Sequence, residues 1–293
     1  MQRLLTILRL SRPLYLLLAA LTYVLGTAIA RYLGHPQTPS VFWLGLIGVL
    51  LAQISMSLLV EVFRPANEPI IQGETPIERK AIYDSALYVS IGALAAAAFV
   101  AVLLFQEGHL LPPVTLFLGL SLIVLILYAV PPARLFDKGF GELLLALHLG
   151  YIIPSIGFLL EAAQYHRLLN TVIIPLTFLA FAAFLALDFP TYADDLKYER
   201  RTLLMHIGWE RAVPLHHGLV IAGYALLACA PLLGFSFSLL WPAFLTLPFA
   251  ALQIFWLHNV ALGAKPIWSM LTANAVSIFG MTAYLLMIAF WLR

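Results

Sequence analysis

The chain has 293 residues, of which 62% are hydrophobic and 10% are charged, and its formal net charge is +2. Soluble domains carry about 25% charged residues, so this composition excludes an ordinary soluble protein and indicates a polytopic membrane protein. The single cysteine excludes a disulfide framework. We therefore expect the lipid bilayer as a partner and no nucleic acid.

The hydrophobic residues fall into long runs. A helix that spans a bilayer needs about 20 mostly apolar residues, and the sequence predicts nine such spans. They lie at 12–33, 40–63, 81–106, 111–129, 142–164, 169–191, 212–234, 238–260 and 268–292. We expect one all-α transmembrane domain over residues 1–293, with a possible internal duplication of four-helix units at 12–129 and 142–260.

Lysine and arginine are unequally distributed between the two sides of these spans. The N-terminus and the loops after the second, fourth, sixth and eighth spans hold most of them, whereas the opposite side holds Arg31, Arg167 and Arg293. Because cytoplasmic loops carry an excess of basic residues, the first side is predicted to be cytoplasmic. We expect an integral, multi-pass protein of a prokaryotic cell membrane with its N-terminus inside.

Two acidic clusters interrupt the apolar pattern, one at the end of the second span and one at the end of the sixth. An ionised carboxylate at such a place is costly unless a cation, a metal or water meets it. Magnesium prefers oxygen ligands and is commonly held by one or two carboxylates together with substrate phosphates. The residues predicted as metal ligands and catalytic residues are Glu61, Glu68, Asp188 and Asp195.

Basic residues next to these clusters suit a phosphorylated substrate. A diphosphate leaves when metal ions and Lys or Arg neutralise its charge. Lys197, Arg200 and Arg201 follow the second cluster and are expected to contact phosphate, and Arg64 lies between the two glutamates of the first. Each charge taken alone has an ordinary interpretation, because helix ends often meet interfacial water.

Two other polar residues are assigned ordinary roles. Glu142 is interpreted as a negative charge that complements the dipole at a helix N-terminus. His148, inside the fifth span, is interpreted as a hydrogen-bonded core residue.

Short motifs in chain order resemble the UbiA-type intramembrane aromatic prenyltransferases, and the resemblance covers nearly the whole chain. The motifs are Ser11-Arg12-Pro13, Leu25-Gly26-Thr27-Ala28, Tyr128 to Leu135 running into Gly139 to Glu142, and Arg201-Thr202-Leu203 followed by Ile207-Gly208-Trp209. The loops are most similar to the menaquinone branch, whose members prenylate 1,4-dihydroxy-2-naphthoate.

The resemblance implies nine transmembrane helices in a ring around a central apolar cavity that opens to the cytoplasmic side. It implies Mg²⁺-dependent transfer of a polyprenyl group from an isoprenoid diphosphate to a lipophilic aromatic acceptor, as in quinone biosynthesis. It also implies that Arg134 and Asp194 join Arg64, Lys197, Arg200 and Arg201 in binding the substrate.

The aspartate motifs of that family are degenerate in this sequence. Glu61 and Glu68 take the first and last aspartate positions of the first motif, and Arg64 replaces the middle one. Thr191 stands where a further aspartate is usual in the second motif. A cationic side chain such as Arg64 at a metal-binding position either neutralises the diphosphate directly or marks an inactive site. Two alternatives therefore stay open, a non-catalytic protein that binds a quinone or isoprenoid lipid, and a small-solute transporter.

Overall fold

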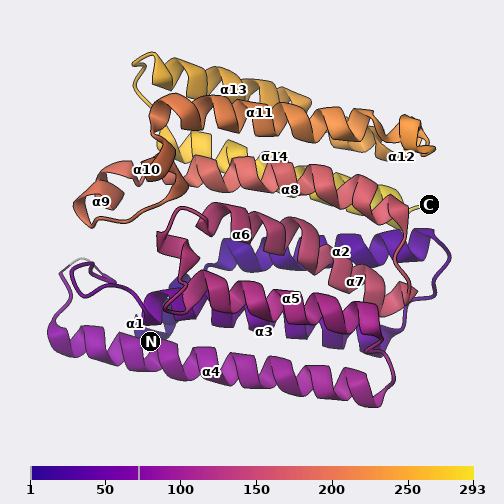
Figure 1. Ribbon diagram of the computed structural model, residues 1–293, viewed down its shortest axis with the longest axis horizontal. Helices are drawn as coiled ribbons and strands as arrows, with labels where there is room; N and C mark the ends of the chain where they lie inside the picture. The colour runs from indigo at the N-terminus through magenta and orange to yellow at the C-terminus, as the bar shows by residue number, and fades with distance from the viewer. Residues whose placement is uncertain (1, 72) are drawn as a thin grey trace.

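The computed structural model describes residues 2–71 and 73–293, and every regular element in this part of the chain is helical (Figure 1). The longer helices are α2 (Pro13–Tyr32), α3 (Pro39–Val62), α4 (Pro76–Gln106), α5 (Pro112–Ala129), α8 (Arg167–Asp188), α11 (Trp209–Ala228), α13 (Leu247–Ala261) and α14 (Trp268–Trp291). The shorter helices are α1 (Gln2–Leu10), α6 (Gly141–Leu147), α7 (Ile153–Ala162), α9 (Tyr192–Lys197), α10 (Leu203–Ile207) and α12 (Phe237–Leu240). The remaining turns are η1 (Leu135–Asp137), η2 (His148–Ile152), η3 (Ala230–Leu233) and η4 (Trp241–Thr246). The predicted all-α class is confirmed.

Proline sets the start of the first four long helices. Pro13, Pro39, Pro76 and Pro112 each occupy the first turn of a helix. The missing N–H of proline costs nothing there, because the first N–H groups of a helix have no intrahelical acceptor. These helices therefore begin abruptly at a proline.

Eight helical stretches in the described residues are long and apolar enough to cross a membrane. They are α2, α3, α4, α5, the continuous run α6–η2–α7, α8, the run from α12 to α13, and α14. The span predicted at 212–234 corresponds to α11, which is helical but carries Glu210, Arg211, His216 and His217 in its first half. These polar residues keep α11 outside the apolar set, so a ninth crossing stays a prediction.

The fifth predicted span changes its winding in the middle. Residues His148–Ile152 form a π turn, and Pro154 follows in the first turn of α7. A proline cannot donate a backbone hydrogen bond, and a π turn is one way for a helix to accommodate the break. His148 is 1% exposed, and its Nε2 lies 2.9 Å from the Ser121 hydroxyl. The interpretation of His148 as a hydrogen-bonded core residue is confirmed.

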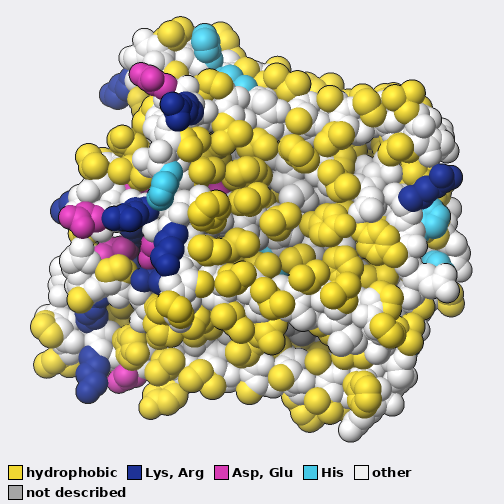
Figure 2. Space-filling view, in the orientation of Figure 1, with side chains coloured by type: hydrophobic (Ala, Val, Ile, Leu, Met, Phe, Trp, Pro, Cys, Tyr) yellow, Lys and Arg dark blue, Asp and Glu magenta, His cyan; other side chains and the backbone are white. Residues whose placement is uncertain are grey.

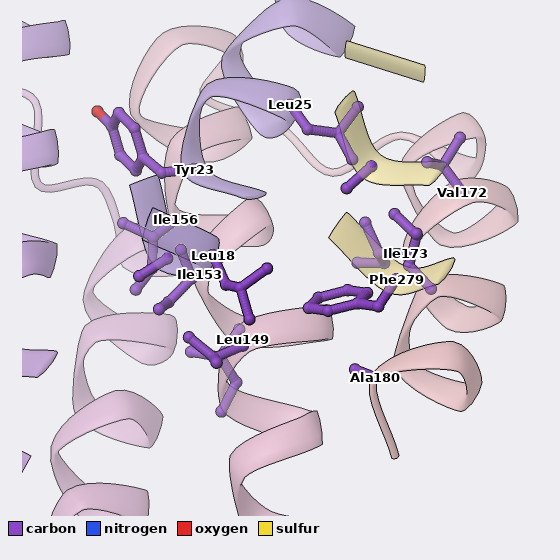
Figure 3. Close-up of a cluster of buried hydrophobic side chains, with 14 of the residues drawn as sticks. Leu18, Tyr23, Leu25, Leu149, Ile153, Ile156, Val172, Ile173, Ala180 and Phe279 are labelled. Atoms are coloured by element: carbon purple, nitrogen blue, oxygen red, sulfur yellow. The ribbon is translucent and has the colours of Figure 1, made fainter. Parts of the chain in front are cut away.

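The core lies where α2 packs against the fifth span, α8 and α14 (Figure 3). Its centre includes Leu18, Leu149 and Phe279, all of which are buried. Glycine allows the closest of these contacts: a Cβ added at Gly26 would lie 2.0 Å from the carbonyl oxygen of Pro154. Small residues at helix crossings are typical of membrane proteins, whose helices associate by close packing of their backbones.

Charged side chains gather at one end of the molecule, and a broad hydrophobic surface covers the helices beside it (Figure 2). In Figure 1 this end carries α9, α10, the start of α4 and the connection between α3 and α4. A band of apolar side chains with charges beyond it is the distribution that a bilayer requires. The two acidic clusters therefore lie at the same end of the protein.

Candidate active site

The first acidic cluster is buried and paired with an arginine. Glu61, near the end of α3, and Glu68, in the following loop, are each 3% exposed. Arg64 lies between them: its Nε donates to Glu61 Oε2 at 2.7 Å, and its Nη1 forms an ion pair with Glu68. The turn after α3, in which the Arg64 N–H donates to the Glu61 carbonyl oxygen at 3.2 Å, brings the guanidinium beside both carboxylates. Arg64 therefore neutralises its own cluster and does not snorkel to the interface.

Arg200 connects the first acidic cluster to the second. Its Nε donates to Glu68 Oε2 at 2.9 Å, and its Nη1 donates to Asp195 Oδ1 at 3.2 Å. The hydroxyl of Thr191 donates to the other oxygen of Asp195 at 2.9 Å. Burial raises the pKa of Asp195, whereas Thr191 and Arg200 act to lower it. Two segments distant in sequence are thereby held together by one forked guanidinium.

Arg12 extends the same network to the start of α2. Its Nη2 lies 3.4 Å from Glu61 Oε1, and its Nη1 lies 3.5 Å from the hydroxyl of Tyr128. Its guanidinium also lies 5.5 Å from the ring centre of Tyr15 and 5.1 Å from that of Phe136. Cation–π contacts at these distances hold the arginine against an aromatic wall.

A cavity of about 180 Å³ opens beside this network. Its charged lining residues are Arg12, Glu142, Asp188, Asp195 and Arg200. The remaining wall is largely apolar and aromatic and includes Tyr15, Tyr128, Phe136, Leu145, Phe184 and Leu187. The cavity thus joins a charged end, suited to an anion with its counter-ions, to an aromatic compartment.

Two carboxylates in this cavity have no cation of their own. Glu142 is 7% exposed, and its Oε1 accepts a hydrogen bond from the Leu203 N–H at 3.2 Å. Among the residues that the structure describes, its Oε2 has no hydrogen-bond partner and is buried, and the same holds for Oδ2 of Asp188. The side chains of Glu142 and Asp188 lie within hydrogen-bonding reach of each other. Carboxylates this close require a shared proton or a cation.

The site meets the needs of a magnesium ion only in part. In the described residues, no group of three or more His, Cys, Asp and Glu side chains is placed to hold a metal ion. Magnesium is commonly bound by one or two carboxylates that share it with substrate phosphates. The free, buried oxygens of Glu142 and Asp188 fit that requirement, whereas the oxygens of Glu61 and Glu68 face arginines.

The predicted substrate-binding residues divide into two groups. Arg64 and Arg200 lie in the buried network, whereas Asp194, Lys197 and Arg201 are exposed. The ammonium of Lys197 lies 4.9 Å from the ring centre of Tyr198.

Arg134 lies outside that network. It pairs with Asp137 at 3.0 Å, and its Nη2 donates to the carbonyl oxygen of Val60 at 3.4 Å. It therefore holds the fourth loop against the end of α3. Burial lowers the pKa of Arg134 and raises that of Asp137.

Sequence reasoning missed two charged residues of the cavity, Arg12 and Glu142. Arg12 was counted only among the basic residues of the N-terminus and as part of a motif. Glu142 was interpreted as a helix N-terminal charge, and it does lie in the first turn of α6. The available signal was the family-like run Gly139 to Glu142, which resembles a motif of the family.

Comparison with known proteins was informative at the level of structure. No family model matches the sequence, and no curated protein matches it. A UbiA homolog from Archaeoglobus fulgidus bound to GPP and Mg²⁺ is similar in structure, with a TM-score of 0.67, 17% sequence identity and 98% coverage of each chain. A structure of digeranylgeranylglyceryl phosphate synthase is similar with a TM-score of 0.66 and 14% identity, covering 100% of this chain and 98% of the other.

A third similar structure is a UbiA homolog from Aeropyrum pernix K1, with a TM-score of 0.52, 12% identity and coverage of 94% of this chain and 96% of the other. Similarity at these identities over nearly whole chains shows a shared fold. The protein therefore has the fold of UbiA homologues, as the motifs predict.

Proposed function

We propose that this protein is an intramembrane prenyltransferase. It transfers a polyprenyl group from an isoprenoid diphosphate to a lipophilic aromatic acceptor, with a quinone precursor such as 1,4-dihydroxy-2-naphthoate as the acceptor. The observation that carries the proposal is the cavity, in which Arg12, Arg200, Glu142 and Asp188 adjoin an aromatic compartment. The similar structures bound to GPP with Mg²⁺ and to DMAPP with Mg²⁺ support it.

The charged end of the cavity is proposed to bind the diphosphate. Arg12 and Arg200 are placed to donate hydrogen bonds to phosphate oxygens, and Lys197 and Arg201 add positive charge at the entrance. Asp188 and Asp195 are the first proposed magnesium ligands, followed by Glu61 and Glu68. Magnesium, when bound, supplies positive charge to the diphosphate as the allylic C–O bond breaks.

The aromatic compartment is proposed to hold the prenyl chain and the acceptor. The faces of Tyr15, Tyr128, Phe136 and Phe184 offer negative potential to the allylic cation that forms when the diphosphate departs. The apolar wall excludes water, so a ring carbon of the aromatic acceptor captures the cation. The proton displaced from that carbon passes to the released diphosphate.

The topology proposed for this activity has nine crossings with α11 as the seventh, and the charged end on the cytoplasmic side. The basic residues at that end support the orientation. In this arrangement the cavity draws its anionic substrate from the cytoplasm and its lipophilic acceptor from the bilayer. The expected location is the cell membrane of a prokaryote.

The test is an assay of the purified protein in lipid nanodiscs. Geranyl and geranylgeranyl diphosphates are offered with a panel of phenolic acceptors, including 1,4-dihydroxy-2-naphthoate, in the presence and absence of Mg²⁺. We expect a prenylated acceptor, detected by mass spectrometry, that depends on Mg²⁺. The proposal is wrong if no acceptor is prenylated by a folded, diphosphate-binding preparation.

A second candidate function is the binding of a quinone or isoprenoid lipid without turnover. The occupation of Glu61 and Glu68 by arginines favours it, because carboxylates engaged in this way are not free to bind metal. It predicts a stoichiometric lipid in the purified protein, identified by mass spectrometry, and no product with any donor and acceptor pair.

A further inference from the structure

We infer that the cavity binds a single divalent cation through Glu142 and Asp188, and that Arg64 and Arg200 occupy the place of a second cation at Glu61 and Glu68. The inference rests on the proposed function, because a diphosphate supplies the remaining oxygen ligands. It adds Glu142 to the proposed magnesium ligands and removes Glu61 and Glu68 from them. It also sets the number of bound divalent cations at one.

Glu142 is held in place inside the cavity and is not a surface charge. The N–H of Leu203 in α10 fixes one oxygen, Oε1, at 3.2 Å. The other, Oε2, is buried, has no partner and belongs to a residue that lines the cavity. A helix-dipole role requires only that a carboxylate lie in the first turn, and exposed carboxylates fulfil it. It gives no reason to bury an oxygen with nothing to bind.

Asp188 supplies the opposing oxygen. It ends α8, lines the same cavity, and leaves its buried Oδ2 without a partner. The negative charges of Glu142 and Asp195 repel a negative charge on Asp188. An ionised carboxylate can only accept hydrogen bonds, so Glu142 and Asp188 have nothing to donate to each other. Neither forms a salt bridge within the described residues.

The other acidic pair, Glu61 and Glu68, differs because arginines contact all of its carboxylate oxygens. Arg12 meets Oε1 of Glu61 and Arg64 meets Oε2. Both Arg64 and Arg200 meet Oε1 of Glu68, and Arg200 donates to Oε2 as well. All four carboxylate oxygens therefore face guanidinium groups, which are permanently charged. A metal ion at this place would have to displace a guanidinium or lie against one, and like charges at such distances repel strongly.

Magnesium chemistry agrees with this division. A hard cation takes oxygen ligands and keeps the positions that the protein does not fill for phosphate oxygens and water. Glu142 and Asp188 are neighbours in a small cavity that Arg12 and Arg200 also line. The two carboxylates would hold one cation, which would supply positive charge to a bound diphosphate. The guanidiniums supply at the first acidic cluster the positive charge that a second ion would bring.

The test counts bound Mn²⁺, which substitutes for magnesium and is detected by electron paramagnetic resonance. The full-length protein in nanodiscs is titrated in the presence of inorganic pyrophosphate, with no prenyl donor or acceptor. We expect about one Mn²⁺ per chain. Glu142→Gln is expected to weaken its binding about 10-fold or more, since loss of even an outer-shell partner costs that much.

Glu161→Gln is the matched control. Glu161 belongs to the same helical run, in α7, and its Oε1 is also buried without a partner. Its Oε2 accepts from the Thr38 N–H at 3.1 Å, outside the charged end. The control is expected to bind Mn²⁺ as the parent does. Thermal unfolding of both variants checks that each is folded.

Three outcomes overturn the inference. They are two bound Mn²⁺ per chain in the parent protein, no Mn²⁺ bound in the presence of pyrophosphate, or equal affinity in Glu142→Gln and Glu161→Gln. The last two leave a shared proton between the carboxylates as the explanation. Failure of the proposed function looks different: Mn²⁺ binds at Glu142 but no acceptor is prenylated.

Discussion

Glu61 and Glu68 lie at the same end of the protein as Glu142 and Asp188. Three of these residues are buried and Asp188 is half-buried, yet the surroundings of the two pairs differ. Arginines meet every carboxylate oxygen of the first pair, whereas each residue of the second keeps one buried oxygen without a partner. The negative charges of the first pair are therefore neutralised by arginines of the protein itself. The second is incomplete and is stabilised by whatever cation or proton enters the cavity.

If the first acidic cluster is a degenerate metal-binding motif, as we propose, this difference shows what the degeneracy changes. An arginine in place of a motif aspartate replaces a dissociable metal ion with a permanent positive charge. That charge still neutralises the neighbouring carboxylates. The structural part of the site then no longer depends on metal, and the part that depends on metal becomes smaller. The residues that distinguish the two parts are Arg64 and Arg200.

The largest expected effect is that of Arg200→Ala, which breaks the first pair. It leaves Glu68 and Asp195 without their shared partner, and breaking such a buried ion pair costs about 3–5 kcal/mol of stability. Turnover should fall by about 100-fold or more, as when a charge-stabilising donor is removed. Thermal unfolding and product formation measure the two effects. Arg211→Ala, at an exposed arginine of α11, is the control, and equal behaviour of the two variants contradicts the assignment.

The second prediction concerns Asp188→Asn, which should separate activity from stability. The substitution removes one of two facing carboxylates and therefore one proposed ligand, so kcat should fall by roughly 100-fold. Stability of the metal-free protein should be unchanged or higher, because the repulsion from Glu142 is relieved. The two measurements are turnover with Mg²⁺ and thermal unfolding in a chelator. The control is Asp194→Asn, at an exposed position of the same segment, and a large loss of stability in Asp188→Asn contradicts the comparison.

The third prediction concerns Arg64, whose removal should make Glu61 and Glu68 more like Glu142 and Asp188, which have no arginine partner among the described residues. Arg64→Ala frees Oε2 of Glu61 and leaves Glu68 with Arg200 as its one arginine partner in the described part of the chain, so the protein should gain a second, weaker Mn²⁺ in the presence of pyrophosphate. Loss of the buried partner should lower stability by about 1–3 kcal/mol. Arg64→Asp should favour the second ion further and raise the magnesium dependence of turnover. Unchanged Mn²⁺ binding and unchanged turnover in both variants would mean that Arg64 does not stand in for a metal.

The sequence predicts the fold well because hydropathy is a local signal. Hydropathy located the long helices, including α11, although the polar residues of α11 separate it from the rest. The pairing of Arg64 with Glu61 and Glu68 is also a local contact, within one turn after α3. Contacts between distant segments have no such signal: nothing local indicates that Arg200 meets Glu68, or that Leu203 fixes one oxygen of Glu142. The unpartnered oxygen of Glu142 depends on that tertiary contact.

The smallest expected effect is that of Lys197→Ala. Sequence spacing groups Lys197 with Arg200, but its side chain is exposed and its ammonium lies over the ring of Tyr198. Exposed charges contribute about 0–1 kcal/mol, so kcat/KM should fall by no more than about 5-fold, with kcat unchanged. The loss should shrink further at high ionic strength, because salt screens exposed charges and affects buried pairs much less. A salt series of kcat/KM for the parent, Lys197→Ala and Arg200→Ala measures this. The Lys197 variant should converge on the parent, whereas the Arg200 variant should not. A salt-resistant loss at Lys197 as large as that at Arg200 would mean that the loop closes over the diphosphate and buries this lysine during turnover.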